Sequence, residues 1–136
     1  MDNLKRVAVF VDNSNVFHHI YDIRKTDKSW VSLYDPLMLA KKLAGNRNLA
    51  YVGFYCVRPP SFLLNGTKEE QKRYNLTQKY YGEIEKLSNV SMKFGDLKGT
   101  RGHLQEKNLD TQLATDMVTM AALDKYDVAI LVSNDG

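Results

Sequence analysis

The clearest hydrophobic pattern in the chain is a run of five apolar residues, 7–11, followed at once by the polar residues 12–15. A run this short is typical of a strand buried on both faces, as in the middle of a parallel sheet. The pattern recurs at 128–132, an apolar run that leads into the polar residues 133–135. Ligands of open α/β sheets bind outside the carboxyl ends of the strands. Two such strands, ending near Asp12 and Asp135, therefore predict a shared site.

Helical periodicity and two further strand patterns alternate between these runs. The predicted helices span 16–23, 35–45, 67–87 and 110–123, and the further strands span 49–57 and 90–94. Asp35 is a predicted N-cap, Thr67 opens a capping box with Glu70, and Gly45 ends its helix. The third helix has candidate core contacts at Tyr74, Tyr81, Ile84 and Leu87. Residues 95–105 are polar and basic, which predicts an exposed loop. The alternation favours a parallel α/β sheet with helices on both faces.

Composition narrows the class of protein. A chain of 136 residues fits one domain, and its formal net charge of +3 permits nucleic-acid binding without requiring it. No apolar run approaches the ~18 residues of a membrane span, and no secretory signal opens the chain, so we expect a cytoplasmic protein. The single cysteine, Cys56, lies in a predicted strand, which favours a buried structural thiol.

The residues best suited to catalysis or metal binding are aspartates. The chain has no phosphate-binding glycine loop, no zinc-type Cys/His cluster and no serine-hydrolase elbow. Grouped carboxylates repel one another unless a cation lies between them, and oxygen ligands select Mg²⁺ or Mn²⁺. Metal-assisted hydrolysis of a phosphodiester suits such a site. Asn15 and Ser133 could orient the carboxylates or the metal-bound water. The candidate acids are Asp12, Asp110, Asp116 and Asp135.

Three stretches, 9–15, 107–110 and 129–135, resemble the signature motifs of NYN domains, a branch of the PIN-like nucleases. The resemblance implies a doubly wound PIN-like fold and cleavage of RNA with Mg²⁺ or Mn²⁺. Its metal-binding acids correspond to Asp12, Asp110 and Asp135, and its partner asparagine corresponds to Asn15. Many bacterial members also have an aspartate at the position of Asp116.

NYN domains normally continue beyond the fourth strand with a further acidic residue, a helix and usually a fifth strand. This sequence stops at Gly136. We therefore expect residues 1–136 to form a single NYN domain with strand order 3-2-1-4, lacking its last strand and helix. The missing layer would leave one edge of the fourth strand unpaired. A homodimer contact or an additional C-terminal domain is expected to cover it.

Each candidate also has a plainer interpretation. Asp12 and Asp110 could be N-caps of the helices that follow them. Asp116 lies about 120° around an ideal helix from Asp110, so the two share a face only if Asp110 precedes the helix. The candidate RNA contacts could equally be solvated side chains; they are Lys107, Arg101, Ser133 and Asn134, with Lys98 and His103 in the same basic loop. Tyr80 and Tyr81 are expected to pack rather than stack on bases, and His18 and His19 are expected to pack or lie at the surface.

The leading hypothesis is a metal-dependent ribonuclease. Its first rival is a catalytically weak or inactive RNA-binding or scaffolding module with the same fold. A second rival is a phosphatase of the haloacid-dehalogenase type, which needs an aspartate two residues after its nucleophile. Ser14 occupies that position and disfavours this rival.

Overall fold

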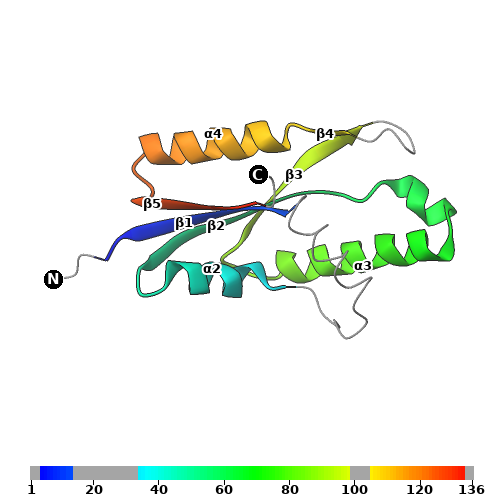
Figure 1. Cartoon of the computed structure of the whole chain (residues 1–136), viewed down its shortest axis with the longest axis horizontal. Coiled ribbons are helices and arrows are strands. Elements are labelled where there is room, and N and C mark those ends of the chain that lie inside the picture. The colour runs from blue at the N-terminus through cyan, green and yellow to red at the C-terminus, as the bar shows by residue number, and fades with distance from the viewer. Residues whose placement is uncertain (1–3, 14–33, 99–104, 134–136) are drawn as a thin grey trace.

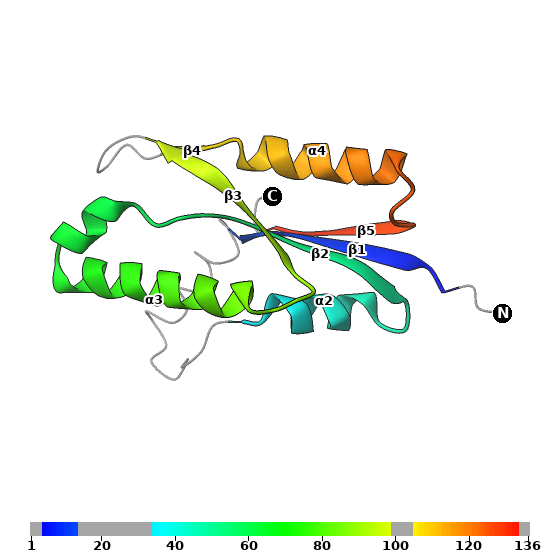
Figure 2. The same cartoon turned by 180° about the vertical axis from the view of Figure 1, so that it is seen from behind.

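The computed structural model describes residues 4–13, 34–98 and 105–133. Figures 1 and 2 show a twisted sheet between two helical layers. In chain order the elements are β1 (Arg6–Asp12), α2 (Pro36–Ala44), β2 (Asn48–Val57), the 3₁₀ helix η1 (Ser61–Asn65), α3 (Lys68–Glu85), β3 (Ser91–Lys98), β4 (Gln105–Lys107), α4 (Leu109–Ala122) and β5 (Val128–Val132). The helix predicted over 16–23 lies outside the described residues.

The sheet order is β4-β3-β2-β1-β5, and its β3-β2-β1-β5 part is parallel throughout. In order of appearance these are the four predicted strands, so the order 3-2-1-4 is confirmed. The first strand lies between two parallel neighbours and under helices on both faces. Its residues 7–11 are accordingly 0% exposed, which explains a strand that is apolar at every position.

Alternate side chains of β1 enter two separate cores. Val7, Val9 and Val11 pack with α2 and α3, whereas Ala8 and Phe10 pack with α4. Figure 1 shows the same division, with α4 on one side of the sheet and α2 and α3 on the other. The prediction of helices on both faces is therefore confirmed. Strand periodicity decides which face each residue of β1 serves.

Two predicted helix starts have the expected caps. The Oδ1 atom of Asp35 accepts hydrogen bonds from the backbone N–H groups of Leu37 and Met38 at 2.8 and 3.2 Å. Thr67 and Glu70 exchange the two hydrogen bonds of a capping box at 3.1 and 3.0 Å. Gly45 ends α2 with a φ of 62°, which suits a residue without a Cβ. Each cap stabilises its helix by about 1 kcal/mol.

The segment 95–105 was predicted to be a loop, and this was wrong at both ends. The third strand continues to Lys98, and residues 105–107 pair with it antiparallel as β4, with Asp96 opposite Lys107. Polar composition does not distinguish a loop from a polar hairpin, because a partner strand can satisfy the backbone groups of either. Residues 99–104 lie outside the described part of the chain.

Two of the four predicted core contacts of the third helix, Tyr81 and Ile84, are confirmed. The buried residues of α3 are Thr77, Tyr80, Tyr81 and Ile84, whereas Tyr74 and Leu87 are half-buried. Tyr80 and Tyr81 pack in the core as expected. Cys56 is buried, as predicted, and burial raises the pKa of its thiol to about 12. None of the described helices is both long enough and apolar enough to cross a bilayer.

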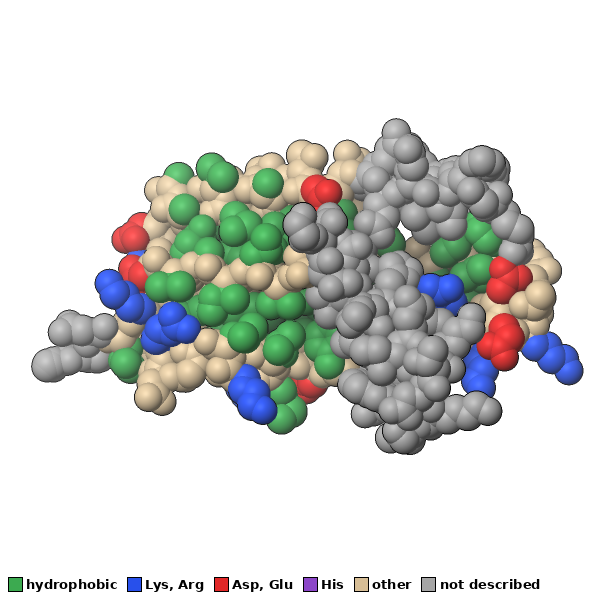
Figure 3. All heavy atoms as spheres, viewed as in Figure 1, with side chains coloured by type: hydrophobic (Ala, Val, Ile, Leu, Met, Phe, Trp, Pro, Cys, Tyr) green, Lys and Arg blue, Asp and Glu red, His purple; other side chains and the backbone are tan. Residues whose placement is uncertain are grey.

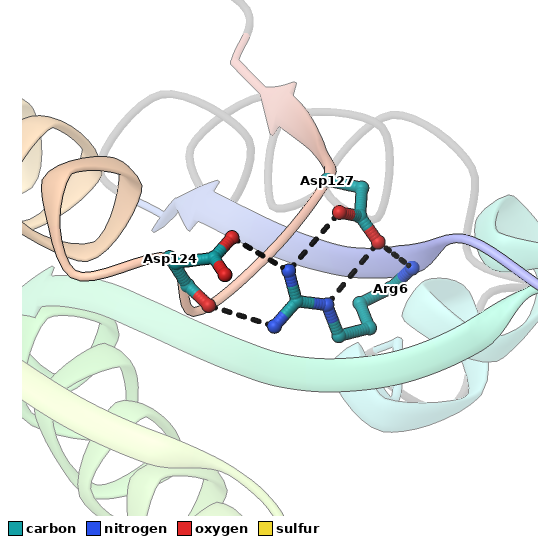
Figure 4. A network of polar contacts seen from close by, with 3 residues as sticks. All are labelled: Arg6, Asp124 and Asp127. Atoms are coloured by element: carbon teal, nitrogen blue, oxygen red, sulfur yellow. Dashed lines mark hydrogen bonds and ion pairs between the residues drawn. The ribbon is translucent and has the colours of Figure 1, made fainter.

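A polar network joins the starts of β1 and β5 (Figure 4). The guanidinium of Arg6 contacts the carboxylate of Asp124 at 2.8 Å and that of Asp127 at 3.0 Å. The backbone N–H of Arg6 also donates to Asp127 at 2.8 Å. These hydrogen bonds lower the pKa of Asp127 to about 2. The network lies at the amino end of β1, so it fixes the sheet at the edge away from Asp12.

Candidate active site

Asp12 is the last residue of the central strand, and its side chain is only 6% exposed. In the sheet register it lies opposite Tyr55 of β2. The alternation of β1 turns Asp12 toward the α4 face, the face that Phe10 also serves. A carboxylate is therefore held in a largely enclosed position at the carboxyl edge of the sheet.

The strand that leads to Asp135 ends beside Asp12. Val11 pairs with Val132 in the parallel β1–β5 register, so residue 133 leaves the sheet at the same edge as Asp12. Ser133 is half-buried there. Asn134 and Asp135 lie outside the described residues, as does Asn15. The predicted meeting of the two strand ends is thus supported by topology, while the position of the Asp135 carboxylate stays a prediction.

Close backbone packing brings the start of α4 to this edge. A Cβ added at Gly95 of β3 would lie 2.8 Å from the Cβ of Leu109 and 3.1 Å from its backbone nitrogen. Gly95 pairs with Val57, the last residue of β2. The absence of a side chain on Gly95 therefore lets the first turn of α4 approach the carboxyl end of β2 and the part of β3 beside it.

Asp110 lies in that first turn and is exposed. Asn108 occupies the N-cap position with a φ of 70°, so the interpretation of Asp110 as the N-cap is wrong. The helix begins two residues earlier than a cap at Asp110 would require. A carboxylate in the first turn is stabilised by the helix dipole, and its oxygens are not needed to cap the helix.

Asp116 is bound to the sheet by a contact that the sequence did not indicate. Its Oδ2 atom accepts a hydrogen bond from the hydroxyl of Tyr55 at 2.7 Å, although the two residues are 61 positions apart. The Tyr55 hydroxyl also lies 3.1 Å from that of Tyr51. Burial, together with the neighbouring hydroxyl and carboxylate, raises the pKa of Tyr55, so its phenol stays protonated and remains a donor.

A glycine makes room for the two tyrosines. A Cβ added at Gly53 would lie 2.6 Å from Cε1 of Tyr55 and 2.7 Å from the hydroxyl oxygen of Tyr51. The pattern Tyr51, Gly53, Tyr55 puts two rings and the space between them on one face of β2. This spacing was visible in the sequence and is the signal that could have indicated the tyrosine pair.

The role of Asn13, the residue that follows Asp12, was also not predicted from the sequence. Its side chain is 0% exposed, and its Oδ1 accepts a hydrogen bond from the hydroxyl of Tyr34 at 2.8 Å. The Tyr80 hydroxyl in turn donates to the backbone oxygen of Tyr34 at 2.8 Å. Burial raises the pKa of Tyr34, and the charge of Asp12 adds to the effect. These contacts fix the backbone directly after Asp12.

A family model of the NYN domain matches residues 6–136. The chain belongs to the NYN domain family. This family groups with the PIN-like nucleases, and the parallel 3-2-1-4 sheet of the structure is consistent with a PIN-like fold. No curated protein and no solved structure matches the chain significantly.

The predicted metal ligands of the NYN domain are carboxylate oxygens, which suit a hard cation such as Mg²⁺ or Mn²⁺. Asp12 and Asp110 belong to the described residues, and both lie at elements that reach the carboxyl edge. Within 4–13, 34–98 and 105–133, no three His, Cys, Asp or Glu side chains are spaced to hold a metal ion. The donor chemistry fits the cation, and the third predicted ligand is Asp135.

The predicted RNA contacts of the NYN domain are only partly described. Lys107 is the last residue of β4, and one residue, Asn108, separates it from the first residue of α4. Its backbone is therefore close to the candidate site, while its side chain lies outside the description. Arg101 and Asn134 lie entirely outside the described residues. Their contact with RNA stays a prediction.

Proposed function

We propose that this NYN domain is a divalent-metal-dependent ribonuclease. The observation that carries the proposal is the position of Asp12, a 6% exposed carboxylate at the end of the central strand, next to the strand end that leads to Asp135. Ligand sites of parallel α/β sheets lie at such strand ends. A buried carboxylate at that edge suits cation binding, because a cation offsets the cost of burying its charge.

In the proposed site, Asp12, Asp110 and Asp135 hold Mg²⁺ or Mn²⁺. The bound ion would polarise a phosphate oxygen of RNA and lower the pKa of a bound water. Asn15 orients Asp12, and the Asn13–Tyr34 contact fixes the backbone next to it. The proposed contacts of the RNA backbone are Lys107, Arg101, Ser133 and Asn134. A cationic side chain beside the site supplies salt-dependent attraction for phosphates.

The test compares Asp12→Asn with the wild-type chain in a cleavage assay with RNA and Mn²⁺. The substitution keeps the size of the side chain and removes its charge, so cleavage should fall by at least 100-fold while the thermal unfolding curve stays cooperative. Glu83→Gln is the matched control, because it removes the charge of an exposed acid whose partner Lys86 is 3.9 Å away. Equal cleavage by wild type and Asp12→Asn would contradict the proposal.

A non-cleaving RNA-binding domain is the second candidate. The formal net charge of +3 suits RNA binding with or without cleavage. Such a domain would bind RNA with unchanged affinity in the Asp12→Asn variant and would leave the RNA intact with or without Mn²⁺. A filter-binding assay beside the cleavage assay separates the two candidates.

A further inference from the structure

A chain of hydroxyl groups connects the sheet to α4 and ends on a carboxylate. Tyr55 donates its proton to Asp116 at 2.7 Å, so in the 3.1 Å contact between the tyrosines Tyr51 is the donor and Tyr55 the acceptor. A hydrogen bond from a hydroxyl to a carboxylate is among the stronger kinds in proteins. Nearby apolar contacts, such as that of Phe10 with Tyr51 at 5.4 Å between ring centroids, limit competition from water.

The Tyr55–Asp116 hydrogen bond fixes both the rotation of α4 about its axis and its position along that axis relative to the sheet. Asp116 lies six residues after Asp110, about 9 Å farther along the helix axis and about 120° around it. A shift of one residue in helix register would turn every side chain by about 100°. The position of Asp110 at the carboxyl edge therefore depends on where the middle of the helix is held.

Apolar packing alone specifies that register less sharply. The face of α4 against the sheet is formed by Leu109 and Leu113 with the half-buried Met117 and Met120. Methionine side chains adapt to irregular gaps and so tolerate small sliding movements. The Gly95–Leu109 contact fixes the beginning of the helix, and the hydroxyl of Tyr126 donates to the backbone oxygen of Met117 at 2.7 Å. The Tyr55–Asp116 hydrogen bond is a side-chain contact between these two points, and unlike apolar packing it has a defined direction.

We propose that Tyr55 is a positioning residue, which holds Asp116 and thereby α4 so that Asp110 is presented at the carboxyl edge of the sheet. The inference rests on the proposed ribonuclease function. It assigns Asp116 a positioning role in place of direct metal binding. Tyr55 is suited to this role because it lies opposite Asp12 in the β1–β2 register, which ties the helix to the strand that carries the first acid.

The experiment measures Mn²⁺ affinity by calorimetry with Mn²⁺ alone, together with thermal unfolding. Tyr55→Phe removes only the hydroxyl and should weaken Mn²⁺ binding by about 10-fold, as loss of a contact that orients metal ligands commonly does. Tyr51→Phe is the matched control, because it removes a neighbouring hydroxyl that does not touch Asp116. Its Mn²⁺ affinity should stay within about threefold of wild type.

Two variants of Asp116 separate positioning from metal binding. Asp116→Asn keeps an oxygen that can accept the Tyr55 hydrogen bond, so its Mn²⁺ affinity should stay within about threefold of wild type. Asp116→Ala removes the acceptor and should weaken binding as much as Tyr55→Phe does. The double variant Tyr55→Phe/Asp116→Ala should be no weaker than either single one, because both changes remove the same contact.

Three results would overturn the inference. The first is Mn²⁺ affinity in Tyr55→Phe equal to wild type, even with a lower unfolding temperature, because the tyrosine would then serve stability alone. The second is loss of binding in Asp116→Asn as severe as in Asp12→Asn, which would make Asp116 a metal ligand. The third is additive effects in the double variant. A wild-type chain that binds no Mn²⁺ would contradict the proposed function itself, which distinguishes the two failures.

Discussion

Gly95 and Leu109 approach so closely that a methyl group on the glycine would lie 2.8 Å from the Cβ of the leucine. Leu109 is the first residue of α4 and is 2% exposed, so it has little room to move aside. This contact brings Asp110 to the edge of the sheet at which β1 and β5 end. The packing of Gly95, which has no side chain that could react or bind a ligand, therefore determines where Asp110, a candidate metal ligand, lies.

Gly95→Ala is expected to displace the start of α4. The added methyl group also meets backbone atoms of Leu109 at 3.1 Å, and overpacking of this kind costs about 1–3 kcal/mol of unfolding free energy. Urea unfolding measures the loss. Gly82→Ala is the control, because no atom lies within 4 Å of its new Cβ and alanine suits a helix better by about 1 kcal/mol. If both variants were equally stable, the close approach would be without consequence.

Tyr34→Phe is expected to destabilise the folded chain, because it removes a contact to Asn13. The hydroxyl that donates to Oδ1 of Asn13 is lost, and the amide is fully buried, so the cost should be about 1–3 kcal/mol. Chemical denaturation of the variant gives this value. Tyr74→Phe serves for comparison, since the Tyr74 hydroxyl makes no hydrogen bond among the described residues and the side chain is half-buried. A similar loss in both variants would argue against a specific contribution from Asn13.

The Arg6 network predicts a pH dependence of stability. Folding lowers the pKa of Asp127 from 3.8 to about 2. The ionised carboxylate is therefore favoured in the folded chain, and its contribution is complete well above pH 3.8 and is lost as the pH falls toward about 2. The difference in urea midpoint between wild type and Asp127→Asn should be largest near neutral pH and should vanish near the lower value. A difference that grows on acidification would have the wrong sign. Because the network is exposed, added salt should weaken it.

Mn²⁺ is expected to stabilise the folded chain through Asp12. At a free Mn²⁺ concentration 100 times its Kd, a single site adds about 2.7 kcal/mol to the free energy of unfolding. The unfolding temperature should rise by several degrees and return when EDTA is added. Asp12→Asn should show little of this rise, whereas Glu83→Gln should behave as wild type. The same rise in Asp12→Asn would place the ion elsewhere.

Local sequence signals predicted most of the framework. The two apolar runs became β1 and β5. Asp35 and Thr67 begin their helices and Gly45 ends one as expected, because capping depends on neighbours in sequence. The parallel direction of the strands followed from the alternation of strands and helices, and their order followed from the resemblance to NYN domains. The start of α4 was harder, because Asn108 takes a left-handed conformation that its sequence neighbours do not reveal.

The contacts that support the candidate site were not predictable in the same way. Tyr55 meets Asp116 across 61 residues, and Gly95 meets Leu109 only because β3 and α4 pack together. Such pairs follow from the folded arrangement, and hydrophobic periodicity carries no information on which side chains will meet. The pairing of residues 96–98 with β4 was missed for the same reason, since both stretches are mostly polar and their pairing depends on both.

The ion pairs of Arg6 lie at one end of the central strand, and Asp12 lies at the other, about 20 Å away for a strand of this length. The ion pairs of Arg6 and the proposed metal site thus occupy opposite ends of the same seven residues. Substitutions around Arg6 are expected to change the tolerance of the chain to acid while the proposed metal site stays as it is. A variant selected for acid tolerance therefore has positions to change that are remote from Asp12.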